Sequence, residues 1–204
     1  MDELKSQLLG QNGRVNEALI LAKLSVHKLD EPTSERYYEE ILPVLQEVDG
    51  FRGLGLWRGT NGDGSHLAIY LYRDFESADD GLKAISDQRS FTSAQNVLSL
   101  PADVVRCRTF QARGLVTTDA PTGSYLSLSI RTSEPGYGPE LAEELERIFD
   151  ELQIIPGFLG SFVGVNDALE EEIVGLASWA SEDAFRTSLP KRSPYEVNLF
   201  KRVI

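Results

Sequence analysis

The sequence is poor in the residue types that bind metals or cross-link a chain. Its 204 residues include one cysteine, one methionine, two tryptophans and two histidines. The single thiol, Cys107, cannot form an intrachain disulfide or a cysteine-rich zinc site. This cysteine usage predicts a reducing, cytoplasmic compartment.

The sequence also lacks long apolar runs and an excess of basic residues. No stretch approaches the roughly 18 apolar residues of a membrane-spanning helix, and the amino terminus has neither the basic nor the apolar region of a signal peptide. Lys and Arg total 20 against 32 Asp and Glu, a net charge of −12. A surface of that sign repels phosphate groups, so we expect no nucleic-acid partner and no membrane association.

What the sequence does contain is a weak internal repeat. Gly50-Phe51-Arg52-Gly53 returns 107 residues later as Gly157-Phe158-Leu159-Gly160. The apolar positions before both motifs keep this offset and recur at helical spacing. They are Tyr38, Ile41, Leu42, Leu45 and Val48 in the first copy and Leu145, Ile148, Phe149, Leu152 and Ile155 in the second. We therefore divide the chain into a first unit, residues 1–118 with an N-terminal extension, and a second unit, residues 119–204.

Each copy is predicted to run strand, helix, strand, strand, helix, strand. Downstream of the motif, Phe75-Glu76-Ser77 resembles Trp179-Ala180-Ser181 at an offset of 104, which predicts a three-residue gap in a turn. Ser77 and Ser181 are the expected N-caps of the second helices. The predicted strands are 18–27, 51–60, 66–73 and 103–116, then 125–131, 158–165, 172–180 and 195–204.

The predicted strands are apolar on both faces. In the strand 66–73, Leu67, Ile69 and Leu71 alternate with Ala68, Tyr70 and Tyr72. A four-stranded sheet with both helices on one face would leave its other face bare, so that face must be covered. We predict an α+β fold in which two tandem ferredoxin-like βαββαβ units pack sheet to sheet as an intrachain dimeric α/β barrel.

Two motifs carry a family resemblance. They are Pro156-Gly157-Phe158-Leu159-Gly160 and Trp179-Ala180-Ser181-Glu182-Asp183-Ala184-Phe185, with weaker versions at 49–53 and 75–80. With these motifs the chain resembles the antibiotic-biosynthesis-monooxygenase-like domains of the dimeric α/β-barrel superfamily, as a tandem fusion. The resemblance implies a monooxygenase that acts without a tightly bound cofactor on an aromatic or polyketide-like small molecule. The alternative is a non-catalytic, stress-related or ligand-binding barrel that takes up a small hydrophobic molecule.

Haem and metals fit this sequence poorly. Haem-degrading members of the superfamily pair a tryptophan with a histidine some ten residues later, but Ser188 follows Trp179 at that distance. Trp57 and His66 have the spacing, yet a predicted hairpin turn separates them. His27 and His66 lack carboxylates at matching spacing, so we expect neither a cofactor nor a metal.

The predicted site lies in the first unit. Alternation puts His66, Tyr70 and Tyr72 on one face of a strand, which we take to face the barrel, with Trp57 on the neighbouring strand. The resemblance implies assisting asparagine, tryptophan and arginine residues; Trp57 and Arg73 can serve as two of these, and no asparagine clearly matches. We therefore predict catalytic roles for Tyr72, Trp57 and Arg73, and ligand contacts from His66 and Tyr70.

Further ligand-binding candidates lie on the first and last strands of this unit. Ser25 and His27 alternate on the first strand, and Arg106 and Arg108 share a face of the last. A cation pointing into the cavity would stabilise a phenolate or enolate. These cations could equally lie at strand ends or on the outer surface.

Three questions stay open in the sequence. The insertion at 88–101 could be a lid over the cavity or an extra helix packed on the edge. Polar residues of the second unit could line a second pocket or face solvent: Ser127, Ser129, Arg131, Glu196 and Asn198. The pseudo-dimer could also associate into a homo-oligomer.

Overall fold

The computed structural model describes residues 17–27, 30–189 and 197–204. The first half of the chain contributes strands β1 (Ala18–Ser25), β2 (Phe51–Gly59), β3 (Ser65–Tyr72) and β4 (Asp103–Gly114), and helices α2 (Glu31–Gln46), α3 (Phe75–Ser86) and α4 (Arg89–Asn96). The second half contributes strands β5 (Tyr125–Thr132), β6 (Phe158–Asn166), β7 (Glu172–Trp179) and β8 (Asn198–Arg202), and helices α5 (Gly138–Leu152) and α6 (Glu182–Ser188).

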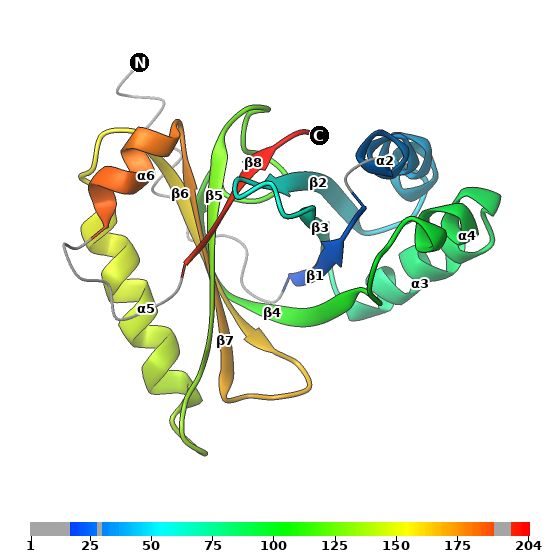
Figure 1. Cartoon of the computed structure of the whole chain (residues 1–204). Helices are drawn as coiled ribbons and strands as arrows, with labels where there is room; N and C mark the ends of the chain where they lie inside the picture. The colour runs from blue at the N-terminus through cyan, green and yellow to red at the C-terminus, as the bar shows by residue number, and fades with distance from the viewer. Residues whose placement is uncertain (1–16, 28–29, 190–196) are drawn as a thin grey trace.

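The eight strands close into one antiparallel barrel, in the order β1-β3-β2-β8-β5-β7-β6-β4. Helices α2, α3 and α4 lie on one side of this barrel, and α5 and α6 lie on the opposite side (Figure 1). The predicted α+β pseudo-dimer of two βαββαβ units is confirmed. The two sheets are also joined by hydrogen bonds at both edges, where β2 pairs with β8 and β4 pairs with β6. The boundary between residues 118 and 119 stays a prediction.

The strand β3 shows why both faces of the sheet are apolar. Leu67, Ile69 and Leu71 are fully or almost fully buried in the barrel interior, where aliphatic side chains from both halves meet. Tyr70 and Tyr72 pack on the opposite face, under the helices. The prediction that the tyrosine face points into the barrel is therefore wrong. An eight-stranded barrel is just wide enough to be filled by its own side chains, and the aliphatic set fills it.

The second helix of each unit begins with a side-chain cap, as predicted, although the capping residue differs in the first unit. Ser181 accepts a hydrogen bond from the Ala184 backbone N–H at 3.2 Å, which confirms it as an N-cap. In the first unit the N-cap is Asp74, whose carboxylate accepts from the Ser77 N–H at 2.8 Å. The prediction of Ser77 as the cap is wrong, because the helix starts at Phe75.

This shift removes the predicted gap in the repeat. The Arg73 N–H donates to the Gly50 carbonyl at 2.7 Å, and the Ala180 N–H donates to the Gly157 carbonyl at 2.8 Å. Both pairs keep the offset of 107, so no residues are lost between the motif and the second helix.

The insertion contains α4, so it forms the extra helix that was one of the two alternatives. Beyond its end, Leu98 bridges to Val26, and the Ser99 N–H donates to the Ser25 carbonyl at 2.8 Å. At the other end of the chain, β8 covers the middle of the predicted strand 195–204, and residues 195 and 196 lie outside the described residues. In the described part of the chain, no helix has the length and apolarity to cross a membrane.

Candidate functional site

A pocket of about 700 Å³ lies between the outer face of the first sheet and helices α2, α3 and α4. This volume is in the range of small-molecule sites. Aliphatic side chains and four tyrosines make up most of its wall. The lining residues include Ile20, Ala22, Tyr70, Tyr72, Val104 and Arg106 from the strands, and Ser34, Tyr37, Tyr38, Asp79, Ile85, Phe91 and Gln95 from the helices.

Three of the tyrosines form a cluster. The ring centroids of Tyr37 and Tyr38 are 5.1 Å apart, and those of Tyr38 and Tyr70 are 6.5 Å apart. Burial is the main cause that raises the pKa of Tyr38 and of Tyr70, and the hydrogen bond between their hydroxyls opposes the rise at Tyr38 and adds to it at Tyr70. Helix α2 thus places two adjacent phenols against one phenol of β3.

Burial keeps these phenols protonated. Desolvation raises the pKa of Tyr37 to about 12 and raises the pKa values of Tyr38, Tyr70 and Tyr72 as well. At neutral pH all four hydroxyls therefore carry a proton. They can donate hydrogen bonds to an oxygen of a bound molecule.

One ion pair borders the pocket. The Arg106 Nη1 lies 2.6 Å from the Asp79 Oδ1, and the Arg106 guanidinium lies 4.8 Å from the centre of the Phe75 ring. Both charged side chains are partly exposed. Among the described lining residues these two are the charged ones, so one carboxylate and one cation stand beside otherwise apolar and phenolic walls.

Three of the predicted site residues lie in this pocket: Tyr70, Tyr72 and Arg106. Trp57 does not, because it is fully buried in the barrel interior, on the other side of the sheet. There the Arg202 guanidinium lies 5.6 Å from the centre of the Trp57 ring. The sheet therefore separates Trp57 from Tyr72.

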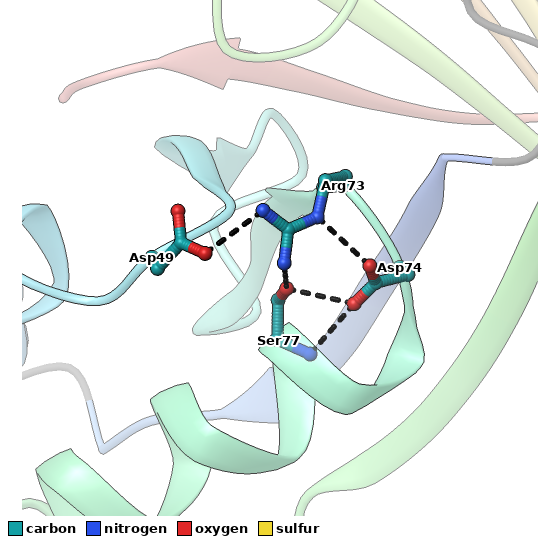
Figure 2. A network of polar contacts seen from close by, with 4 residues as sticks. All are labelled: Asp49, Arg73, Asp74 and Ser77. Atoms are coloured by element: carbon teal, nitrogen blue, oxygen red, sulfur yellow. Dashed lines mark hydrogen bonds and ion pairs between the residues drawn. The ribbon is translucent and has the colours of Figure 1, made fainter.

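Arg73 lies in an exposed polar network rather than in the pocket (Figure 2). It donates hydrogen bonds to Asp49 and Asp74, both at 2.9 Å, and to the Ser77 hydroxyl at 3.2 Å. The network joins the turn after α2 to the first turn of α3. Arg73 therefore connects the end of α2 to the start of α3, which is a structural role.

The remaining predicted residues also lie outside the pocket lining. His66 is buried at the other end of β3, with its Nδ1 3.1 Å from the Gly64 carbonyl oxygen. Ser25 and His27 lie at the end of β1, and His27 is exposed. Arg108 is on the surface, 3.4 Å from both Asp167 and Glu170.

Sequence reasoning missed the contribution of the helices to this site. Tyr38 is among the apolar positions at helical spacing in the repeat, and no role was predicted for Asp79. A signal was present, because Ser34, Tyr37 and Tyr38 put three hydroxyls on the buried face of one helix. Buried hydroxyls need partners, so such a face points to a polar contact beneath the helix.

The described residues contain no group of three or more histidine, cysteine, aspartate or glutamate side chains placed to hold a metal ion. Cys107 points into the barrel core, and burial raises the pKa of its thiol to about 12. A thiol in that state is a poor nucleophile at neutral pH.

Comparisons with known proteins find the fold but no close relative. No family model matches the sequence, and no curated protein matches it. Solved structures match over almost the whole chain. A candidate monooxygenase from Fusobacterium nucleatum has a TM-score of 0.74 at 11% identity, covering 93% of this chain and 94% of that one. One from Lactobacillus acidophilus has a TM-score of 0.70 at 14% identity, covering 92% and 94%.

An anthrone oxidase-like protein also matches, with a TM-score of 0.67 at 12% identity, covering 93% of this chain and 92% of that chain. At such identities the likeness establishes the fold and not the chemistry. The chain has the dimeric α/β-barrel fold of monooxygenase-like proteins, with both units of the barrel in one polypeptide.

Proposed function

We propose that this protein is a cytosolic oxygenase that works without a tightly bound cofactor on an aromatic or polyketide-like small molecule. The observation that carries the proposal is the pocket beneath α2, α3 and α4, where phenols and an Asp79–Arg106 pair face an apolar space. The structural neighbours, two candidate monooxygenases and an anthrone oxidase-like protein, support the same reaction class.

Oxygenation of this kind begins with a stabilised carbanion. The substrate is a hydroxylated aromatic ketone with an acidic ring CH₂. Asp79 is the carboxylate among the described lining residues, and we assign it the role of proton acceptor. Arg106, 2.6 Å away, stabilises the negative charge, and the protonated hydroxyl of Tyr72 donates to the substrate oxygen on which charge develops.

The carbanion then reacts with dioxygen. One electron passes to O₂, and the two radicals combine to form a carbon–oxygen bond, which gives a peroxide. Loss of the second hydrogen of the CH₂ as a proton, with cleavage of the O–O bond, leaves a carbonyl and one molecule of water. The net change is CH₂ plus O₂ to C=O plus H₂O, and the protein supplies position, a base and hydrogen bonds.

Oxygen uptake with an anthrone-like hydroxylated ketone tests the proposal. Asp79→Asn should lower kcat by about 100-fold or more, and Tyr72→Phe by a smaller factor. The matched control is Asp167→Asn, because Asp167 also faces an arginine of β4, Arg108, but outside the pocket. Uptake no faster than in buffer, or equal rates in wild type, Asp79→Asn and Tyr72→Phe, would retire the oxygenase.

A second function is a non-catalytic barrel, stress-related or otherwise, that holds a small hydrophobic ligand. Two features favour it: the pocket phenols are held protonated, and Asp79 is already paired with Arg106. A pocket whose base is occupied can bind without reacting. Tight binding of the anthrone-like probe without oxygen uptake would select this function.

A further inference from the structure

The walls of the pocket change in character between its interior and its opening. The phenols lie toward the buried end, with Tyr37 at 7% exposure and Tyr38 at 4%, among buried aliphatic side chains such as Leu24 and Ile85. Three aliphatic side chains stand open to solvent at the opening, Leu82 at 55% exposure, Leu100 at 63% and Val104 at 54%, beside the polar Asp79, Gln95, Ser99 and Arg106. The pocket thus buries its phenols and leaves three large aliphatic side chains exposed, although such side chains are usually found inside a protein.

The charges around the pocket limit which chemical group of a ligand can occupy its buried end. Among the described lining residues no cation accompanies the buried tyrosines, since the Arg106–Asp79 pair lies where both side chains are partly exposed. An ionised head group would lose its hydration at the buried end without gaining a counter-charge. A neutral hydroxyl would instead exchange hydrogen bonds with the phenols.

The exposed aliphatic side chains of the opening favour an apolar occupant. Leu82 comes from α3, Leu100 follows α4 and Val104 belongs to β4, so three separate elements bring hydrocarbon to one opening. This rim, defined as Leu82, Leu100 and Val104, is continuous with the pocket. A ligand longer than its buried head would leave through the rim and cover it.

From this arrangement we infer that the pocket takes an amphipathic phenol or hydroquinone, with its hydroxylated ring inside and a hydrocarbon tail along the rim. The inference rests on the proposed function for its choice of pocket, but it concerns binding alone. It excludes fatty acids bound carboxylate-first, because the buried end offers no cation.

Binding of three probes under anaerobic conditions tests this ligand class by calorimetry. The probes are 4-ethylphenol, 4-octylphenol and decanoate. The affinity of the alkylphenols should rise by about two- to fourfold for each methylene that the rim covers. Decanoate should bind at least about tenfold more weakly than 4-octylphenol. Equal affinity for the two alkylphenols, or for decanoate and 4-octylphenol, would overturn the inference.

Variants of the rim locate the tail. Leu82→Gln and Leu100→Gln should weaken 4-octylphenol by about fivefold and 4-ethylphenol much less, because only the longer tail reaches the rim. The matched control is Ile154→Gln, which removes an aliphatic side chain that is 87% exposed and far from the pocket lining. Thermal melting of each variant checks that it is folded.

Two outcomes of this series contradict the inference. Equal weakening of both alkylphenols by the rim variants would mean that the rim acts through the fold. A lower molecular mass of Leu100→Gln in light scattering, with its 4-octylphenol affinity unchanged, would show that the rim contacts a second copy of the chain. Because no oxygen is present, failure of the oxygenase proposal leaves these readouts unaffected.

Discussion

Tyr72 in the first half and Trp179 in the second occupy equivalent places in the two sheets. Tyr72 pairs with Phe51 across β2 and β3, and Trp179 pairs with Phe158 across β6 and β7. Both side chains are almost fully buried, with ring centres 5.5 and 5.3 Å from those of the paired phenylalanines. Yet Tyr72 borders the pocket, whereas Trp179 also packs against Phe185 of α6, with ring centres 6.0 Å apart. The same frame holds a cavity on one side of the barrel and an aromatic core on the other.

In the second half, small residues on β7 let a helix pack closely onto the sheet. A Cβ atom on Gly175 of β7 would stand 2.5 Å from a methyl group of Leu145, so α5 packs directly onto the strand. Two residues further along, Ala177 takes the place that Tyr70 has in the first half. Since α5 lies so close to its sheet, the layer is filled by side chains of the two elements.

Polar groups in that layer are paired with one another. Ser127 donates to the Ala177 carbonyl at 3.2 Å and accepts from the Trp179 indole N–H at 3.1 Å. Arg131 donates to Ser129 at 3.1 Å. The polar groups of this layer thus bond to one another within the second half. The buried phenols of the first half instead border a cavity.

The largest difference between the halves should appear on truncation of the two equivalent aromatics. Trp179→Ala removes the centre of a packed core and should cost about 3–5 kcal/mol of unfolding free energy. Tyr72→Ala should cost about half as much, because Tyr72 is the smaller side chain and borders the pocket. Urea denaturation measures both, and equal losses would break the comparison.

A glycine of α3 gives a sharper test of how the pocket wall is built. A Cβ on Gly81 would lie 2.4 Å from the Tyr72 hydroxyl oxygen, so Gly81→Ala should force the phenol to move. In an exposed helix this change stabilises by about 1 kcal/mol, but here overpacking should make it cost about 1–2 kcal/mol.

The second variant in this test is Tyr72→Leu, which shortens the side chain that the new methyl group meets. In that background Gly81→Ala should become neutral or stabilising in the same urea titration. If it destabilises both backgrounds equally, Gly81 does not act through Tyr72.

Smaller effects should follow from the two N-caps, which differ in chemistry. Hydrogen bonds from the Ser77 backbone and hydroxyl, then from Arg73, lower the pKa of Asp74 to about 2. Since an ordinary aspartate has a pKa of about 3.9, Asp74 stabilises the fold fully above about pH 4, and this contribution is lost as the pH falls toward 2. Ser181 has no charge to lose.

Alanine variants at about pH 7 and about pH 2.5 separate the two caps. Ser181→Ala should cost about 1 kcal/mol at both pH values. Asp74→Ala should be destabilising at the higher pH and clearly less so at the lower one. A loss for Asp74→Ala that does not change with pH would mean that its charge plays no part.

Much of the fold could be predicted because the repeat and the two-faced strands constrain it strongly. Gly50 and Gly157 keep one offset, and a strand such as β3, apolar on both faces, must be covered on both. The same two-faced apolar character made the site hard to predict. When both sets of alternating residues are apolar, the sequence does not say which set faces the barrel, and Tyr70 and Tyr72 were placed on the wrong side.

Local similarity also misled the prediction of the second helix. Phe75 and Trp179 are both aromatic, and each has a serine two positions later, so they were matched at an offset of 104. The backbone hydrogen bonds instead keep an offset of 107 residues. The pocket itself depends on contacts between elements far apart in the chain. Tyr37 meets Phe91 of α4 with ring centres 6.5 Å apart, and no pattern within either helix encodes that contact.

The smallest expected effect concerns the pocket phenols, which should not respond to pH below about 9. Because burial raises their pKa values above the ordinary value of about 10, the protonated form is favoured in the folded state. Stability linked to these groups is thus full below about pH 10 and is lost as the pH rises toward 12. Tyrosinate absorbance should rise later in the native protein than in the urea-unfolded chain. If the absorbance titrations of the native and unfolded protein coincide, the phenols are hydrated. The first half would then not contain an enclosed pocket, and the comparison with the packed second half would fail.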